Sequence, residues 1–364
     1  MSSALAVVIP SIGRPSLQRL LDSLAAQQDV DGVWPPSSGV FVVDDRPDPV
    51  PPLRPVAAAG RPAVVVTGGG RGPAAARNTG WRAAADAGAR WIAFLDDDVV
   101  APPGWSAALA ADLAHCGPGV AGTQGRITVP TAHPGRPTDW ERNTAALETA
   151  RWPTADMAYR TAALTAVGGF DERFPRAYRE DADLAVRVRR AGWELEVGRR
   201  TITHPVRPAD DRVSIRVQQG NADDALLRAL YGRGWRAVAE TGPGRDLAHG
   251  VTVAAAAVAV AGLALRRPTP AAAGLATWAA LTADFTRRRL APGPRPGDPG
   301  WAAEVRRMVL TSAAIPPAAL RHRLLGAWRW RRGVRPWSPA DVAPTERGVA
   351  AANRGVAATT GGRR

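Results

Sequence analysis

Three consecutive carboxylates follow a short apolar run in the first third of the chain. The run is Trp91 to Leu95, and the acids are Asp96, Asp97 and Asp98. Charges of one sign this close repel each other, so the cluster is costly unless a cation or solvent offsets it. Mg²⁺ and Mn²⁺ prefer oxygen ligands and commonly join one or two carboxylates to substrate phosphates. The triplet is therefore either a metal site for a phosphate-bearing substrate or a solvated acidic turn.

A second acidic pair, Asp44 and Asp45, follows the apolar run Val40 to Val43. A carboxylate at a strand end can accept a hydrogen bond from the ring N–H of a base or from a ribose hydroxyl. Pro47 comes shortly afterwards, and such a sequence also fits an ordinary turn. The pair is a candidate nucleoside contact, with a turn as its alternative.

A third acidic pair begins a predicted helix near the middle of the chain. Leu184 and Val188 share one helical stripe, which puts Glu180 and Asp181 at the helix N-terminus. The positive end of the helix dipole stabilises acids there, so capping alone explains them. The functional alternative is a general base, which needs a carboxylate within hydrogen-bond reach of an acceptor hydroxyl. His204, which follows a strand-like segment, is either a ligand or a structural histidine.

Alternating strand and helix signals must position these side chains. Over the first ~205 residues the alternation predicts a mostly parallel sheet flanked by helices. The predicted strands are Leu5 to Ile9, Val40 to Val43, Ala63 to Val66 and Trp91 to Leu95, and helices begin at Pro15 and Pro73. Ligands of an open parallel sheet bind at the carboxyl ends of strands, near a topological switch point. Ser11 and the first two acidic clusters are therefore expected along one edge of the sheet.

The ordered set of motifs resembles a family 2 glycosyltransferase of the GT-A fold. The set comprises Val8-Ile9-Pro10-Ser11, Val42-Val43-Asp44-Asp45, residues 68–78, Leu95-Asp96-Asp97-Asp98, Gly168-Gly169-Phe170-Asp171-Glu172, Glu180-Asp181-Ala182-Asp183-Leu184 and His204. Each motif is short, but their order and spacing together are specific, and they extend over residues 4–206. The resemblance implies an α/β fold: a GT-A-type nucleotide-binding, mostly parallel sheet flanked by helices, with an α-helical C-terminal extension.

The resemblance also implies a role for each motif. The nucleotide sugar would be bound by Pro10, Ser11, Asp44, Asp45, Arg77, Asn78, Asp96 and Asp97. A Mg²⁺ or Mn²⁺ ion would be held by Asp96, Asp98 and His204. The catalytic base would be Asp181, supported by Glu180, and the loop under the acceptor would be Gly168, Gly169, Phe170, Asp171 and Glu172. The implied reaction is a single displacement with inversion at the anomeric carbon.

Two departures from the family pattern bear on these expectations. Members usually continue their first acidic pair with Gly-Ser-x-Asp, whereas this chain has Arg46-Pro47-Asp48-Pro49. The nucleoside contacts around Asp44 are therefore open. The Gln-x-x-Arg-Trp motif of processive members is missing from the sequence, which favours a non-processive enzyme.

Apolar segments in the last third of the chain predict membrane association. Ala248 to Leu265 is flanked by arginines and lies at the lower length limit for a spanning helix, so it spans, lies in the interface or packs in a core. Residues 315–330 interleave Trp with Arg, which is typical of an interfacial helix or of a domain-packing helix. The expected parts are a catalytic domain (1–245), a helical, membrane-associated region (246–342) and a disordered tail (343–364).

Composition limits the partners and the compartment. The 364-residue chain has a net charge of +14, and all 47 basic residues are Arg, concentrated in the second half. This asymmetry favours a surface-binding tail over a specific nucleic-acid partner. Cys116 is the only cysteine, so no intrachain disulfide forms, as in a reducing compartment. We expect a cytoplasmic protein at the inner face of the cell membrane, acting on a lipid-linked or cell-envelope acceptor.

Two other functions stay open at this stage. A nucleotidyltransferase also uses a nucleotide-binding sheet with Mg²⁺, but its glycine-rich loop lies near the N-terminus, whereas residues 68–72 come too late. A catalytically inactive adaptor for membrane or nucleic acid could use the same fold, although the intact acids Asp96, Asp98 and Asp181 argue against it. The sugar, the nucleotide and the acceptor are not encoded readably in loop residues.

Overall fold

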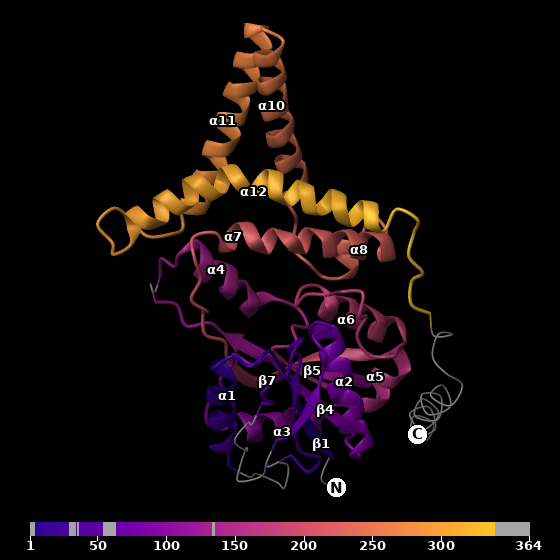
Figure 1. Cartoon of the computed structure of the whole chain (residues 1–364). Helices are drawn as coiled ribbons and strands as arrows, with labels where there is room; N and C mark the ends of the chain where they lie inside the picture. Colours follow the sequence, from indigo (N-terminus) through magenta and orange to yellow (C-terminus); the bar gives the residue numbers. More distant parts are fainter. Residues whose placement is uncertain (1–3, 29–33, 35, 54–62, 133–134, 339–364) are drawn as a thin grey trace, which may run out of the picture.

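A computed structural model describes residues 4–28, 34, 36–53, 63–132 and 135–338 (Figure 1). These residues form an α/β domain with a layer of helices above it and a helical hairpin that projects from this layer. The predicted tail, residues 343–364, lies outside the described residues.

The α/β domain is built on one seven-stranded sheet with the order β3-β2-β1-β4-β6-β5-β7. The strands are β1 (Leu5–Ser11), β2 (Val40–Asp44), β3 (Val64–Thr67), β4 (Trp91–Leu95), β5 (Val120–Thr128), β6 (Asp156–Arg160) and β7 (Glu194–Thr203). Neighbouring strands are parallel except around β6, which runs antiparallel to β4 and β5. The predicted mostly parallel sheet is confirmed.

The four N-terminal strands bring their polar ends to one edge. In the parallel register, Ser11 of β1 pairs with Asp44 of β2, and Asp44 pairs with Thr67 of β3. From β1 the chain proceeds to β2 and β3 on one side, and β4 then returns to the other side of β1. The sheet therefore has its topological switch point between β1 and β4, where a crevice for a ligand is expected.

Helices cover both faces of the sheet. Alternate residues of β1 enter two separate apolar clusters, with Val7 on one face and Val8 on the other. The first cluster packs under α1 (Ser16–Ala25) and α3 (Trp105–His115), and the second under α2 (Pro73–Asp86), α5 (Thr161–Val167) and α6 (Glu180–Arg190). A central parallel strand is buried on both sides, which explains why β1 is continuously apolar.

The helical layer packs on the domain through α6. It contains α4 (Asp139–Ala145), η2 (Ala146–Thr149), α7 (Val213–Arg216), η3 (Val217–Gly220), α8 (Asn221–Tyr231), α9 (Trp235–Val238) and α12 (Trp301–Arg329). Val186 of α6 and Leu227 of α8 share an apolar cluster. A Cβ added to Gly326 of α12 would lie 2.7 Å from the carbonyl oxygen of Ala222, so α12 and α8 are in close contact. Helix α12 therefore packs on protein, and the domain boundary at residue 245 stays a prediction.

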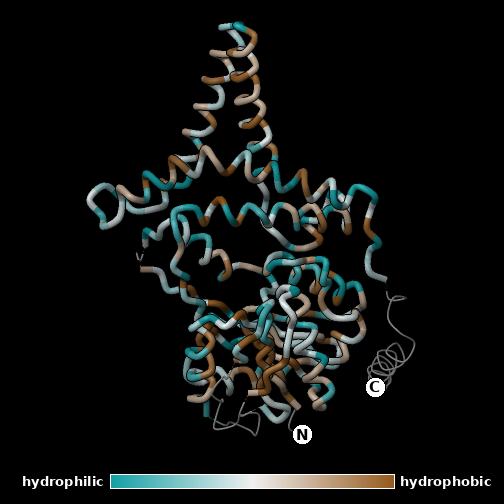
Figure 2. The backbone as a smooth tube through the Cα atoms, viewed as in Figure 1, coloured by the Kyte–Doolittle hydropathy of each residue, from teal (hydrophilic) through white to brown (hydrophobic). Residues whose placement is uncertain are grey.

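Helices α10 (Asp246–Ala264) and α11 (Pro268–Leu290) form the projecting hairpin, which carries many apolar residues (Figures 1 and 2). Small residues form the seam between the two helices. A Cβ on Gly262 would lie 2.5 Å from the backbone nitrogen of Ala271, and one on Gly274 would lie 2.5 Å from that of Ala259. Among the described helices, only α10 has the length and composition to cross a membrane.

Candidate active site

A cavity of about 200 Å³ opens at the switch point of the sheet. Its walls come from the ends of β1, β2 and β4, from the start of α2, and from the segments before α6 and after β7. The lining residues are Pro10, Ser11, Ile12, Arg14, Asp45, Pro73, Arg77, Asp96, Asp97, Ala177 and Arg207. The structure therefore brings together six of the eight residues predicted to bind the nucleotide sugar: Pro10, Ser11, Asp45, Arg77, Asp96 and Asp97.

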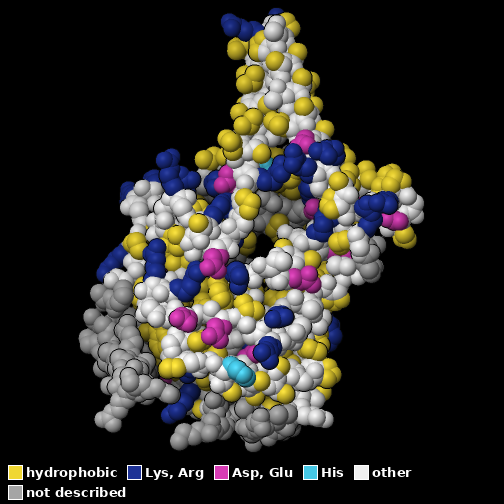
Figure 3. Space-filling view, turned by 180° about the vertical axis from the view of Figure 1, so that it is seen from behind, with side chains coloured by type: hydrophobic (Ala, Val, Ile, Leu, Met, Phe, Trp, Pro, Cys, Tyr) yellow, Lys and Arg dark blue, Asp and Glu magenta, His cyan; other side chains and the backbone are white. Residues whose placement is uncertain are grey.

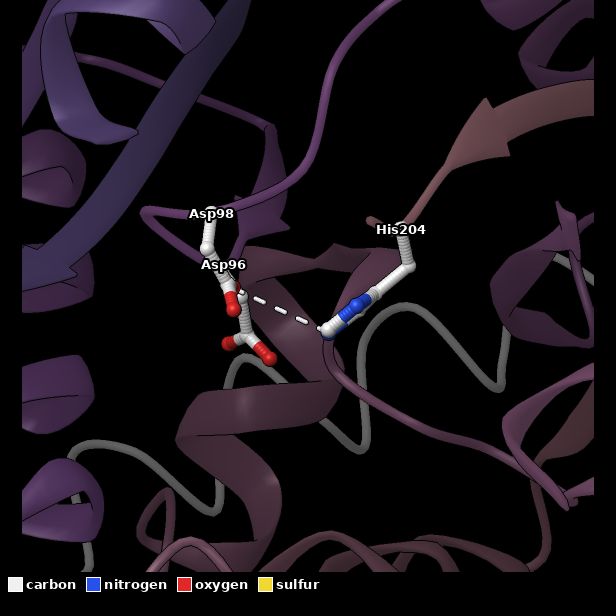
Figure 4. Close-up of side chains that lie close together, drawn as sticks. All are labelled: Asp96, Asp98 and His204. Carbon is white, nitrogen blue, oxygen red and sulfur yellow. Dashed lines mark ion pairs between the residues drawn. The ribbon is translucent and has the colours of Figure 1, made fainter. Parts of the chain in front are cut away.

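The predicted metal ligands converge beside this cavity. Ligand atoms of Asp96, Asp98 and His204 lie within 4.8 Å of one another (Figure 4). His204 Nε2 is 3.7 Å from Asp98 Oδ1, and that oxygen is buried with no hydrogen-bond partner among the described residues. A buried carboxylate oxygen without a partner is costly, and a cation would satisfy it. Two carboxylates with one imidazole fit Mg²⁺ or Mn²⁺.

The backbone around His204 explains how the imidazole reaches the acids. The His204 N–H donates to the Thr128 carbonyl oxygen at 2.8 Å, which continues the pairing of β7 with β5. Its ring Nδ1 lies 3.2 Å from the Pro205 carbonyl oxygen. If Nδ1 carries the proton in this contact, Nε2 is left as the lone-pair nitrogen that faces Asp98.

Arg77 connects the metal-site acids to the acidic pair of α6. Its side chain is 2% exposed, and it donates to Asp96 Oδ1 at 2.8 Å and to Glu180 Oε1 at 2.7 Å. Two carboxylates compensate the buried guanidinium. Burial opposes ionisation of Asp96, but Arg77 and His204 together hold the pKa of this carboxyl below its usual value. Residues distant in sequence thus form one charged network.

The two carboxyl groups at the start of α6, Glu180 and Asp181, have raised pKa values. Burial raises the pKa of Glu180 to about 8; the neighbouring Asp181 charge adds to the rise, and Arg77 opposes it. Burial likewise raises the pKa of Asp181, against a hydrogen bond from the Ala182 N–H and the charge of Arg77. A carboxylate with a raised pKa is better matched to accept a proton near neutral pH. Neither acid lines the cavity, whereas Ala177 of the preceding segment does.

Both carboxylate oxygens of Asp44 are paired with Arg46. Arg46 Nε and Nη2 donate to its two carboxylate oxygens at 2.8 and 2.6 Å, and this pairing is the main cause of its lowered pKa. Asp44 does not line this cavity, and its predicted contact with the nucleotide sugar stays a prediction. Asp45 lines the cavity instead and accepts the backbone N–H groups of Arg71 and Gly72 at 3.1 and 2.9 Å. The Arg46 that replaces the family's glycine is the sequence signal for this difference.

The side chain of Asn78 holds a loop and does not line the cavity, so its predicted role in donor binding stays a prediction. Its amide donates to the Phe170 carbonyl oxygen and to Glu172, both at 2.9 Å. Its Oδ1 accepts the Phe170 N–H at 2.8 Å and Trp81 Nε1 at 3.0 Å. A Cβ on Gly169 would lie 2.4 Å from Asn78 Oδ1, so this close approach requires glycine.

The predicted acceptor loop lies on a different cavity. Gly168, Gly169, Phe170, Asp171 and Glu172 line a space of about 350 Å³ that is closed by residues 335–337. Their side chains are engaged internally. Asp171 pairs with Arg173 at 2.6 Å and Glu172 with Arg71 at 3.0 Å. The loop therefore does not line the cavity of the metal-site acids, and its assignment as the acceptor loop stays a prediction.

Asn78→Ala is expected to lower the free energy of unfolding by about 2–3 kcal/mol, because it leaves buried loop groups without partners. The affinity for nucleotide should change little, since the side chain does not reach the cavity. Chemical denaturation and nucleotide titration measure the two effects. Thr79→Ala, one residue further along α2, is the control and should cost less than about 1 kcal/mol. If Asn78→Ala lost much of its nucleotide affinity while its stability was unchanged, Asn78 would contact the donor.

Two arginines that the sequence analysis did not single out complete the cavity. Arg14 Nη1 donates to Asp97 at 2.8 Å, and Arg207 Nε donates to Asp98 Oδ2. Both guanidinium groups line the cavity and both are partly exposed, so they can turn toward a phosphate-bearing ligand. Their positions in the loops after β1 and β7 are the signal that could have found them.

A switch-point cavity with acids, arginines and a possible metal-ligand cluster is typical of nucleotide-binding α/β enzymes. Comparison with protein families matches residues 6–182 to glycosyl transferase family 2. The match covers β1 through the start of α6, including the acids at both ends of the Arg77 network. Residues 6–182 therefore carry the domain of this family, and this domain supports a glycosyltransferase.

Several solved structures are similar to this chain at low identity. Glucosyl-3-phosphoglycerate synthase from Mycobacterium tuberculosis in complex with uridine diphosphate is 18% identical, with a TM-score of 0.39, over 66% of this chain and 81% of that one. The same synthase with Mn²⁺, uridine diphosphate and phosphoglyceric acid is 16% identical, with a TM-score of 0.39, over 66% and 80%. TarS from S. aureus is 16% identical, with a TM-score of 0.37, over 89% and 92%. A search of curated proteins gave no match.

Proposed function

We propose that this glycosyltransferase is metal-dependent, inverting and non-processive, and that it moves a sugar from a nucleotide-sugar donor to an acceptor hydroxyl. The observation that carries the proposal is the convergence of Asp96, Asp98 and His204 beside a switch-point cavity. Arg77 ties this cluster to the acids of α6, so a metal site and a base lie in one network.

The donor would lie along the cavity with its diphosphate toward the metal-site acids. Asp96, Asp98 and His204 would hold Mg²⁺ or Mn²⁺, which when bound offsets the negative charge of the leaving diphosphate. Arg14 and Arg207 are placed on the cavity wall to donate hydrogen bonds to phosphate oxygens. The nucleoside would rest on the β1 and β2 ends, at Ser11 and Asp45.

The acceptor hydroxyl would attack the anomeric carbon on the face opposite the leaving group, which inverts its configuration. As the new C–O bond forms, the bond from the anomeric carbon to the diphosphate oxygen breaks, and the hydroxyl proton passes to the Asp181 carboxylate. The transition state is expected to be oxocarbenium-like, as in other glycosyl chemistry. Glu180, paired with Arg77 at 2.7 Å, fixes the start of α6 and with it Asp181.

A thermal-shift panel of nucleoside diphosphates and nucleotide sugars tests the donor and the metal together. One class of nucleotide is expected to stabilise the protein in the presence of Mn²⁺. The gain is about 2.7 kcal/mol when the nucleotide concentration is a hundredfold above its Kd. Chelation of the metal should remove most of this stabilisation. Pyrophosphate release from a nucleoside triphosphate would favour a nucleotidyltransferase instead. RNA binding with a steep salt dependence, and no nucleotide effect, would favour an inactive adaptor.

We also propose that the enzyme works at the cytoplasmic face of the cell membrane, on a lipid-linked or cell-envelope acceptor. The support comes from the hairpin, whose outward side chains include Leu247, Val260 and Leu263 at 82%, 66% and 70% exposure. No carboxylate occurs between residues 247 and 283. The 19 residues of α10 extend about 28 Å, close to the ~30 Å hydrocarbon core of a bilayer.

The charges of the hairpin fit the same placement. Arg266 and Arg267 lie in its turn, and arginines also gather around its base (Figure 3). Arginines at both ends of an apolar hairpin match two layers of anionic lipid headgroups. The tight seam of Gly and Ala is the packing that helices use in lipid, where apolar burial alone gives no driving force.

The double variant Val260→Asp, Leu263→Asp is expected to abolish flotation of the full chain with anionic vesicles. An Asp in the middle of a membrane helix costs about 2.5–3.5 kcal/mol, so partitioning should fall by at least ~100-fold. Val64→Asp, at an apolar residue of β3 that is 48% exposed, is the control and should float like the wild type. Equal flotation of all three proteins, or a hairpin-dependent dimer without vesicles, would contradict the membrane assignment.

A further inference from the structure

A large apolar groove lies at the base of the hairpin, between α11 and α12. Its volume is about 770 Å³, within the range of small-molecule sites. Its walls are mostly apolar and include Trp278, Leu290, Trp301, Val305 and Val309. The groove therefore offers a hydrocarbon ligand a surface at the level where the proposed membrane insertion begins.

Cationic side chains line the same groove. Arg287 is 70% exposed and pairs with the partly exposed Asp284 at 3.1 Å. Arg295 is also exposed, and it forms no ion pair with any carboxylate that the structure describes. An apolar groove with an arginine rim is complementary to a hydrocarbon chain that carries a phosphate.

An unsatisfied hydroxyl supports a polar ligand atom at one wall. Thr282 lines the groove, and its Oγ1 is buried with no hydrogen-bond partner among the described residues. Buried hydroxyls nearly always have a partner, and a missing one is costly. A head-group oxygen in the groove would satisfy this hydroxyl.

Smaller cavities extend from the groove toward the catalytic side. Thr282 also lines a space of about 190 Å³, which shares Arg245, His249 and Phe285 with a third space of about 250 Å³. Trp140 lines the third space, and its Nε1 donates to the backbone oxygen of Arg207 at 2.8 Å. The side chain of Arg207 lines the catalytic cavity. A polar head group can thus be directed toward the reacting centre while its chain stays in the groove.

We infer that the groove between α11 and α12 binds the hydrocarbon chain of a lipid-phosphate-linked acceptor, with the phosphate against Arg287 and Arg295 and the acceptor hydroxyl on the head group beyond it. This inference rests on the proposed function, since it names the acceptor class of the same enzyme. The chain packs on Trp278 and Trp301, and Thr282 meets the polar end.

Photo-crosslinking tests the groove without turnover. The probe is a long-chain alkyl phosphate with a diazirine near the end of its chain, irradiated with the full-length protein in mild detergent. Label is expected within residues 278–309, and an excess of unlabelled alkyl phosphate should compete it away. Ala279→Trp fills the groove and should lower labelling about tenfold. Ala280→Trp, the next exposed residue of α11 but outside the lining, should label like the wild type.

A competition experiment tests whether Arg295 recognises the phosphate of the lipid. Arg295→Gln is expected to weaken competition by the alkyl phosphate several-fold, with competition by a long-chain alcohol unchanged. Equal labelling of the two Trp variants, or label spread over the outer faces of the hairpin, would overturn the groove as a lipid site. Nucleotide-dependent stabilisation would persist in that case. The converse result, specific label without any nucleotide effect, would instead reject the proposed function.

Discussion

Asp181→Asn is expected to lower kcat by about 10²–10⁴-fold, the usual contribution of a general base, and to leave donor binding intact. The amide keeps the size of the carboxylate but cannot take the acceptor proton. Asp181 lies at the start of α6, beside Glu180 and within the electrostatic reach of Arg77 and Asp96. Donor affinity by thermal shift and transfer of a labelled sugar measure the two parts separately. Wild-type turnover in this variant would remove Asp181 from the mechanism.

The pH dependence of kcat tests the assignment of Asp181 as the general base a second time. Because burial raises the pKa of Asp181, kcat of the wild type should rise with pH through that raised value, and Asp181→Asn should lose this limb. Folding stability should move the other way. Burial raises the pKa of Glu180 from 4.5 to about 8, so the folded state binds more protons over this interval. The free energy of unfolding therefore falls as the pH rises through it, and Glu180→Gln should flatten the fall.

Asp98→Ala is expected to lower kcat/KM by at least ~10²-fold and to remove the Mn²⁺ dependence of nucleotide binding. Asp98 contributes the buried oxygen that has no hydrogen-bond partner among the described residues and lies 3.7 Å from His204 Nε2. Without it, Asp96 and His204 remain as two ligands, too few to hold the ion in place. Transfer assays and Mn²⁺ titrations, each with and without nucleotide, measure the loss.

Asp97→Asn is the matched control for Asp98→Ala. Asp97 lies between the two predicted ligands, but its carboxylate accepts Ser11 Oγ at 2.7 Å and Arg14 Nη1 at 2.8 Å. Its loss should raise the KM for the donor and leave the response to Mn²⁺ unchanged. Mn²⁺-dependent nucleotide binding that survived in Asp98→Ala would contradict the metal site.

Much of the fold and part of the site could be predicted because they depend on local patterns. Apolar runs such as Leu5 to Ile9 set the strands, and the polar residues that end them lie at one sheet edge in any parallel arrangement. The predicted N-terminal position of Glu180 and Asp181 on a helix is confirmed for the same reason, since helical periodicity is a property of neighbouring residues.

The surroundings of Asp44 and Asn78 depend on which distant side chains meet. Asp44 could be judged only once Arg46 was seen to fold back on it, and Asn78 only once α2 was packed against Phe170. The order of motifs along the chain does not say which residues of a motif face the cavity and which face the protein.

By itself the sequence determined the strands, the acidic strand ends and the apolar hairpin helices, because short-range periodicity and composition specify them. Only the tertiary structure decided that Arg77 joins Asp96 to Glu180, two residues that are far apart in the sequence. The physical reason is that such pairing depends on strand order and helix packing, which are set by the burial of the whole apolar core and not by any single segment.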